Sequence, residues 1–226
     1  MSRRDNDYYP TGPDLALALR QWADDQLEHG QQWLDPAAGP GLLLEAMADD
    51  PRDRFGIEID PQWQPELRRV AGAGCIIADS LAVDWPGWPL VMNHPFRFTD
   101  AFVARAVAHG RACMVDVIAI IRTSWFQTAK SFAVPMPHDI ILPTWRTSFT
   151  GDGETDMQGV VGAVWRGDEH FEQDEAVRLH GASYVPTRLW RVEKPAVPAE
   201  MVERHRRLSL GIEARQGALP GLEVAS

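Results

Sequence analysis

The chain has 226 residues, of which 45% are hydrophobic and 24% charged, as expected of a globular protein with one α/β domain and modest extras. No apolar run approaches the ~18–20 residues that a membrane-spanning helix needs, so no membrane partner is expected. The net charge of −10 argues against a strong general affinity for nucleic acid, because phosphate binding is largely electrostatic.

The cysteines and histidines are scattered. Cys75 and Cys113 stand alone, without the paired spacing of a zinc site or a disulfide framework, and the histidines show no ligand-like spacing either. The first residues carry two arginines but no apolar segment behind them, so no signal peptide is expected. The sequence therefore predicts a cytoplasmic protein without a metal.

Strand-like and helix-like stretches alternate through roughly the first 165 residues. This alternation predicts an α/β fold whose sheet is mainly parallel, with helices on both faces. In chain order, we expect strands at Gln32–Leu34, Arg54–Ile59, Cys75–Ala78, Leu90–Met92 and Ala112–Ile121, and helices at Leu42–Ala48 and Ala101–His109.

The pattern changes after Phe132. Residues 133–157 are punctuated by proline and glycine and are predicted to form a loop insertion, after which Val160–Trp165 returns to strand character. Beyond Gly167 the chain is polar, and Met201–Ala214 has the spacing of a helix with a basic face. We expect a domain over 1–166, including the insertion, and a C-terminal extension over 167–226 that packs on it.

The segment from Leu34 to Gly41 reads Leu-Asp-Pro-Ala-Ala-Gly-Pro-Gly and lies between a strand and a helix, where a doubly wound fold binds its ligand. Its two glycines allow a backbone turn to approach a ligand closely. A dinucleotide fingerprint needs a third glycine at the position of Leu44, so a nicotinamide or flavin cofactor is disfavoured. The alternative to a ligand-binding loop at this segment is a plain tight turn that binds nothing.

Two further strands are expected to end in acidic residues. Glu58 follows Gly41 by 17 positions, and a carboxylate there can accept hydrogen bonds from both ribose hydroxyls. Ile59 would pack on an adenine face, and Asp79 can accept from an adenine amino group. A solvated acid at the end of a strand is the alternative at both positions.

The next expected strand runs into Asn93-His94-Pro95-Phe96. An exocyclic amino group is a poor nucleophile, because its lone pair is delocalised into the ring. An amide oxygen and a neighbouring backbone carbonyl can accept its two N–H bonds and favour a more pyramidal nitrogen. An aromatic ring can hold a base that has left its helix. Catalysis would then rest on positioning and preorganised dipoles.

In this order and spacing, the motifs resemble those of S-adenosylmethionine-dependent N6-adenine DNA methyltransferases of the phage type, whose fourth motif reads Asn/Asp-Pro-Pro-Tyr/Phe. The four motifs cover about 62 residues. Downstream, Arg146–Asp156 is similar to a segment of the small phage enzymes, and Tyr8–Thr11 resembles the element that precedes their glycine loop.

The resemblance implies a Rossmann-like methyltransferase fold, S-adenosylmethionine as cofactor, and methyl transfer to N6 of adenine in DNA. It implies that Thr11 binds the methionine end, Glu58 the ribose and Asp79 the adenine of the cofactor. In the substrate site, Asn93 would grip the amino group and Phe96 would stack on the target base. The full set implied is Thr11, Asp35, Pro36, Gly39, Gly41, Glu58, Ile59 and Asp79 for the cofactor, and Asn93, His94, Pro95 and Phe96 for catalysis.

Two positions depart from the family pattern. His94 replaces the first proline of the fourth motif, so the carbonyl survives but the fixed φ of proline is lost. His94 is either a substrate contact or a tolerated change at a rigid turn. Gly12 follows Thr11 where the family has proline, and Pro13 comes one place later.

The acceptor is left open between DNA, RNA and a protein glutamine amide, and a cofactor-binding protein without turnover is a further alternative. For DNA, we expect weak binding with low sequence specificity, and a homodimer is an open alternative to a monomer. Basic residues in the C-terminal part either follow phosphates or form a solvated face; they are Arg188, Arg191, Lys194, Arg204, Arg206 and Arg207.

Overall fold

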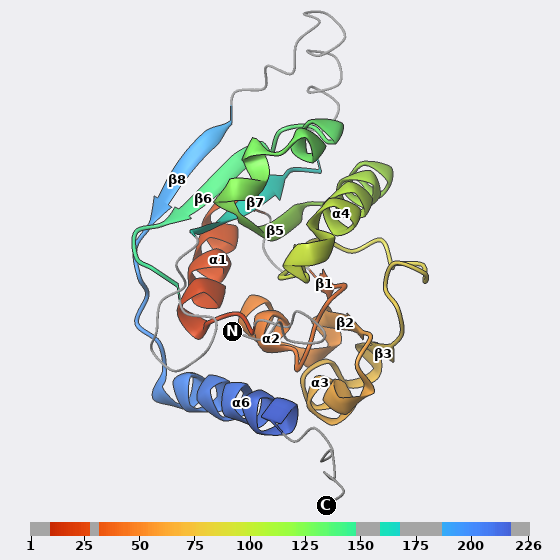
Figure 1. The fold of residues 1–226 in the computed structure, drawn as a ribbon, viewed down its shortest axis with the longest axis vertical. Helices are drawn as coiled ribbons and strands as arrows, with labels where there is room; N and C mark the ends of the chain where they lie inside the picture. The colour runs from red at the N-terminus through yellow and green to blue at the C-terminus, as the bar shows by residue number, and fades with distance from the viewer. Residues whose placement is uncertain (1–9, 28–31, 148–158, 168–186, 218–226) are drawn as a thin grey trace, which may run out of the picture.

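The computed structural model describes residues 10–27, 32–147, 159–167 and 187–217. Their strands form one eight-stranded sheet in the order β3-β2-β1-β4-β5-β7-β6-β8 (Figure 1). The strands are β1 Trp33–Asp35, β2 Arg54–Glu58, β3 Cys75–Ile77, β4 Leu90–Met92, β5 Val117–Arg122, β6 Asp139–Pro143, β7 Val160–Trp165 and β8 Arg188–Val192.

The sheet is mainly parallel, which confirms the predicted α/β fold class. The five strands from β3 to β5 run parallel to one another. Strand β7 runs antiparallel to both of its neighbours, β5 and β6, while β8 pairs parallel to β6. After β1 the chain adds β2 and β3 on one side and then crosses to β4 on the other. The boundary between β1 and β4 is therefore the topological switch point, where such sheets bind ligands beyond the carboxyl ends of their strands.

Helices cover both faces of the sheet. Along β5, Ile118 and Ile120 pack in the same core cluster as α1, α2 and α3, whereas Ala119 and Ile121 pack in the cluster that holds α4. In the described part of the chain, no helix combines the length and the apolar character needed to span a membrane. The helices are α1 Pro13–Gln26, α2 Leu42–Met47, α3 Gln64–Ala71, α4 Thr99–Cys113 and α6 Ala199–Gly217; the 3-10 turns are η1 Pro51–Asp53, η2 Pro61–Trp63, η3 Gly72–Gly74, η4 Phe96–Phe98, η5 Thr123–Gln127 and η6 Ala129–Ala133.

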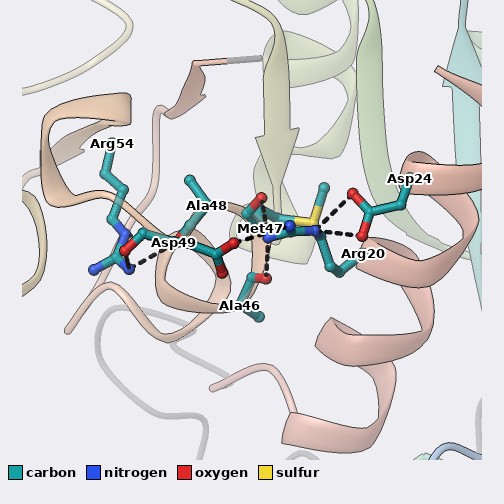
Figure 2. A network of polar contacts seen from close by, with 7 residues as sticks. All are labelled: Arg20, Asp24, Ala46, Met47, Ala48, Asp49 and Arg54. Carbon is teal, nitrogen blue, oxygen red and sulfur yellow. Dashed lines mark hydrogen bonds and ion pairs between the residues drawn. The ribbon is translucent and has the colours of Figure 1, made fainter. Parts of the chain in front are cut away.

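Two arginines fix the end of the short helix α2, as Figure 2 shows. Arg20 on α1 donates to the Met47 carbonyl at 2.9 Å and pairs with Asp24 at 2.7 Å. Arg54 on β2 is only 8% exposed and donates to the Ala48 carbonyl from Nε at 2.9 Å and from Nη2 at 2.6 Å. The last carbonyls of a helix lack partners within it, so these bonds hold α2 between α1 and β2. The start of α2 is held in place with it.

Three segments differ from the sequence prediction. The predicted strand Ala112–Ile121 is wrong in its first half, because α4 continues to Cys113 and turns through Met114 in the left-handed region, at φ 55°. The range 133–157, expected as a loop insertion, contains strand β6. The polar stretch after Gly167 contains strand β8, whose pairing with β6 extends the sheet.

A buried carboxylate joins the last strands. Asp139 on β6 is fully buried and accepts from Arg166 Nε, Arg188 Nε and Trp190 Nε1, each at 2.7 Å. Burial alone would raise the pKa of Asp139, but these hydrogen bonds hold it below its ordinary value. The carboxylate thus connects β6, the residue after β7, and β8. The boundary proposed at residue 166 remains a prediction, and the sheet continues across it.

Candidate cofactor and substrate site

The predicted site residues follow neighbouring strands of the sheet. Asp35 ends β1, Glu58 ends β2, Asp79 comes shortly after β3, and Asn93 follows β4. These four strands are parallel, so their carboxyl ends meet at one edge. The structure therefore brings the strand-end residues of all four motifs to the edge that contains the switch point between β1 and β4.

The glycine loop between β1 and α2 depends on its two glycines. Gly39 and Gly41 have φ values of 53° and 82°, in the left-handed region that side chains with a Cβ rarely adopt. A Cβ on Gly41 would also lie 3.0 Å from the Cβ of Val70 on α3. Pro36 is buried at the start of the loop. The loop is therefore a tight, closely packed turn.

Glu58 fastens this loop to the end of β2. Its Oε2 accepts from the Gly39 N–H at 2.7 Å, and its Oε1 accepts from the Asp60 N–H at 2.8 Å. The side chain is 7% exposed, and burial raises the pKa of Glu58 against the opposing effect of these two hydrogen bonds. Sequence reasoning assigned Glu58 to a ribose and missed its bond to the loop, which links two segments 19 residues apart.

Asp35 lies deeper in the same corner. It is 2% exposed, and its Oδ1 accepts from the Ala37 N–H at 2.9 Å. Burial, helped by the nearby Glu58 carboxylate and opposed by the hydrogen bond from Ala37, raises the pKa of Asp35 to about 8. With a pKa of about 8, Asp35 is mostly protonated at neutral pH.

Two candidate adenine contacts face outward at this edge. Ile59 follows the buried Glu58 directly and is 60% exposed. Asp79 is also exposed, and its Oδ1 accepts from the Leu81 N–H at 2.9 Å, so it shapes a turn after β3. An apolar side chain next to a buried carboxylate can support a planar ring above a hydrogen-bonded sugar.

Thr11 lies under helix α6. It is 5% exposed and lines a small pocket at the starts of α1 and α2, next to Leu42, which directly follows the glycine loop. Arg204 of α6 pairs with Glu45 on α2, and the His205 ring hydrogen-bonds to the carbonyl of Pro10. Helix α6, from the C-terminal extension, thus covers the residue expected at the methionine end.

His94 faces the interior. The ring is 2% exposed and stacks on Phe102 of α4, with centroids 5.6 Å apart and planes at 18°. Its Nε2 lies 3.0 Å from Thr99 Oγ1, and that hydroxyl donates to the Phe96 carbonyl at 2.8 Å, so Nε2 carries the proton that His94 donates. Burial lowers the pKa of His94 to about 3, which keeps the ring neutral. His94 therefore braces the turn through Pro95 to Phe96, a role that neither sequence interpretation included.

Phe96 is half-buried and contacts an arginine from the neighbouring strand. The Arg122 guanidinium, at the carboxyl end of β5, lies 4.2 Å from the centroid of the Phe96 ring. The His94 ring meets Phe96 edge-on at 6.3 Å. Sequence reasoning missed Arg122; the available signal was a charged residue ending a buried strand next to β4.

A second arginine–phenylalanine pair follows in the same turn. The Arg97 guanidinium lies 4.6 Å from the centroid of the Phe98 ring. Phe98 is 45% exposed and is the one exposed aromatic residue among the side chains that the structure describes. The start of α4 therefore presents both a ring and a cation to solvent.

Most cations of the C-terminal part pair with carboxylates of this chain. Arg188 pairs with Asp139, and Lys194 lies 3.5 Å from Asp14. The other pairs are Arg204 with Glu45, and Arg206 and Arg207 with Glu203. These pairs reduce the positive charge that the C-terminal part could offer to phosphates.

Parts of the sequence motifs lie outside the described residues: Tyr8 and Tyr9, and the segment Arg146–Asp156 from residue 148 onward. Before it, the Trp145 Nε1–H donates to Asp14 at the start of α1, at 2.8 Å.

Within the described ranges, no cluster of three or more His, Cys, Asp or Glu residues is arranged to hold a metal ion.

No protein-family model and no curated protein matches the sequence. Solved structures do share the fold. A proposed class I S-adenosylmethionine-dependent methyltransferase from Listeria monocytogenes is 14% identical with a TM-score of 0.52, over 90% of this chain and 72% of its own. A proposed RNA methyltransferase from Pyrococcus horikoshii is 17% identical with a TM-score of 0.53, over 71% and 87%. The modification subunit of a proposed type I restriction enzyme from Vibrio vulnificus is 13% identical with a TM-score of 0.52, over 96% and 54%. The chain thus has the Rossmann-like fold of these proteins.

Proposed function

We propose that the chain is an S-adenosylmethionine-dependent methyltransferase that modifies an exocyclic amino group, with N6 of adenine in DNA as the first candidate. One observation carries the proposal: the four motifs, read from the sequence in order, end neighbouring parallel strands at the switch point of a sheet with this fold. RNA and a protein glutamine amide are the other candidate acceptors.

The cofactor is assigned to the corner formed by the glycine loop and the end of β2. Glu58 would accept from the ribose hydroxyls while it keeps its bonds to Gly39 and Asp60. Ile59, 60% exposed, would pack on the adenine, and Asp79 would accept from its amino group. When bound, S-adenosylmethionine supplies a methyl group on a positively charged sulfur.

At the substrate side, Asn93 would accept one N–H of the target amino group through its amide oxygen, and the backbone carbonyl of His94 would accept the other. These bonds orient the nitrogen lone pair, and the proton displaced by the methyl group passes to solvent. The neutral, buried His94 ring acts indirectly, because its hydrogen bond through Thr99 holds the carbonyl of Phe96 in the turn. Catalysis by positioned dipoles needs no strong base.

Nucleic acid is favoured over protein as the acceptor. The Pyrococcus horikoshii neighbour is described as an RNA methyltransferase, and the Vibrio vulnificus neighbour as a modification subunit. Phe96, three residues after Asn93, would supply the ring on which a flipped base stacks. The family that the motifs resemble acts on DNA, which makes DNA the first choice.

The test is transfer of a labelled methyl group from S-adenosylmethionine to single-stranded and duplex DNA, to RNA, and to glutamine-containing peptides. Asn93→Ala should reduce turnover roughly 10²–10³-fold and leave the Kd for S-adenosylhomocysteine within a few-fold, as for loss of one preorganised contact. Gln32→Ala removes an exposed amide at the opposite edge of the sheet and is the matched control. Full activity of Asn93→Ala on the true substrate would refute the amino-group mechanism. Cofactor binding without transfer to any acceptor would favour a non-catalytic protein.

A further inference from the structure

Two arginine–phenylalanine pairs lie at the end of the fourth motif and directly after it, and we call these four side chains the Arg–Phe corner: Phe96, Arg97, Phe98 and Arg122. They come from two elements, the turn η4 and the end of β5. A guanidinium lies over each phenyl ring: Arg122 Cζ is 4.2 Å from the centroid of Phe96, and Arg97 Cζ is 4.6 Å from the centroid of Phe98. At such distances, the positive charge is attracted to the ring face.

The corner is continuous with the predicted substrate site. Phe96 lies three residues after Asn93, and Arg122 ends the strand that pairs with β4. Arg122 covers one face of the Phe96 ring, and the ring also packs against the buried core, so an incoming base would contact the part of Phe96 that stays exposed. Two positions along the chain, the exposed Phe98 ring presents a second stacking surface.

The C-terminal part of the chain offers few cations to a nucleic acid. The protein carries a net charge of −10, and the C-terminal cations pair with Asp14, Glu45, Asp139 and Glu203. The two arginines of the corner lie over aromatic rings beside the predicted substrate site. Alternating rings and cations are what a sequence-tolerant, single-stranded nucleic-acid site requires.

We propose that the Arg–Phe corner binds an unpaired nucleic-acid strand, with the target base on Phe96, a neighbouring base on Phe98, and the backbone near Arg97 and Arg122. This inference rests on the proposed nucleic-acid methyltransferase function and specifies its substrate as a single strand. A duplex keeps its bases stacked, and extruding one costs a few kcal/mol. Two arginines offer little phosphate binding to offset that cost.

The test measures binding of fluorescent oligonucleotides to the full chain in the presence of S-adenosylhomocysteine. Single-stranded DNA, single-stranded RNA and a DNA hairpin of the same sequence are compared over a range of salt concentrations. Phe98→Ala should weaken binding of the single strand by about 5- to 150-fold, the effect of losing one base-stacking contact. Arg97→Ala should weaken it as well and reduce its salt dependence.

Two control variants match these changes at other places. Leu189→Ala removes an exposed apolar side chain on β8, and Arg52→Ala removes an exposed cation in η1, just before the amino end of β2. Both should bind the single strand as the parent does. Calorimetry with S-adenosylhomocysteine confirms that each variant is folded and keeps its cofactor site.

The outcomes separate the inference from the function on which it rests. If Phe98→Ala and Arg97→Ala bind the single strand like the parent, or if the hairpin binds tighter than the strand, the Arg–Phe corner is not a single-strand site, while nucleic-acid methylation can still stand. If the parent binds no oligonucleotide but methylates a glutamine peptide, the nucleic-acid function itself is wrong. The two single-stranded probes tell DNA from RNA.

Discussion

Asp35 makes the protein's stability depend on pH in a direction that can be worked out. In the folded chain its carboxyl is buried and has a pKa of about 8, whereas an aspartate in an unfolded chain ionises near pH 4. Between these values, folding takes up a proton. Stability is therefore greatest at the acidic end of this window and falls as pH rises, by up to about 1.4 kcal/mol per pH unit.

Asp35→Asn should remove this dependence. The amide oxygen can still accept from the Ala37 N–H, and no buried charge forms at high pH. Urea unfolding followed by tryptophan fluorescence at pH 5, 6, 7 and 8 should show that the variant loses stability with pH less steeply than the parent. It should gain most over the parent at pH 8.

Asp79→Asn is the matched control. Asp79 also accepts from the N–H two residues ahead at 2.9 Å, at the same edge of the sheet, but its side chain is exposed. Its pH profile should follow the parent's. Equal slopes for the parent and Asp35→Asn between pH 5 and 8 would show that Asp35 is ionised when folded and that the argument from burial is wrong.

Three further substitutions test the site and its support. In Glu58→Gln, the new side-chain N–H faces the N–H of Gly39 or Asp60, so one of these hydrogen bonds is lost. Calorimetry should therefore show a roughly 10–100-fold higher Kd for S-adenosylhomocysteine. An unchanged Kd would mean that Glu58 does not belong to the cofactor site. His94→Pro loses the ring stack on Phe102 and a buried hydrogen bond, so unfolding should be easier by about 2–4 kcal/mol; a gain in stability would mean that the ring is dispensable. Arg54→Met removes the hydrogen-bond donor of the Ala48 and Val70 carbonyls, so the free energy of unfolding in urea should fall by about 2–4 kcal/mol. The exposed control Arg52→Met should lower it by less than about 0.5 kcal/mol. Equal losses would contradict the role of Arg54 seen in Figure 2.

The strands of the parallel half of the sheet could be predicted because local sequence patterns mark them. Apolar runs, the glycine loop, the acid that ends β2 and the acid shortly after β3 are all features of consecutive residues. The end of α4 lacked such a feature, since Met114 adopts the left-handed conformation without being glycine or asparagine. The run from residue 112 therefore read as one strand.

Contacts between distant residues account for the rest. Strand β6 begins with Asp139, and a charged residue at this position favours the prediction of a loop. In the structure, Arg188 and Trp190, about fifty residues later, donate hydrogen bonds to the carboxylate, which allows it to be buried in a strand. The position of Arg122 over Phe96 likewise depends on β5 pairing with β4. His94 could not be interpreted from its motif, because its partners lie on α4.

Strand β8 sets a lower limit to how far the chain can be shortened. A protein that ended at residue 166 would leave β6 as an open edge, with backbone groups free to pair with another molecule. Asp139 would keep Arg166 but lose Arg188 and Trp190, so a carboxylate now fully buried would lose most of its donors. Expression of such a fragment should give aggregates, and a soluble fragment of this chain must extend at least through Val192.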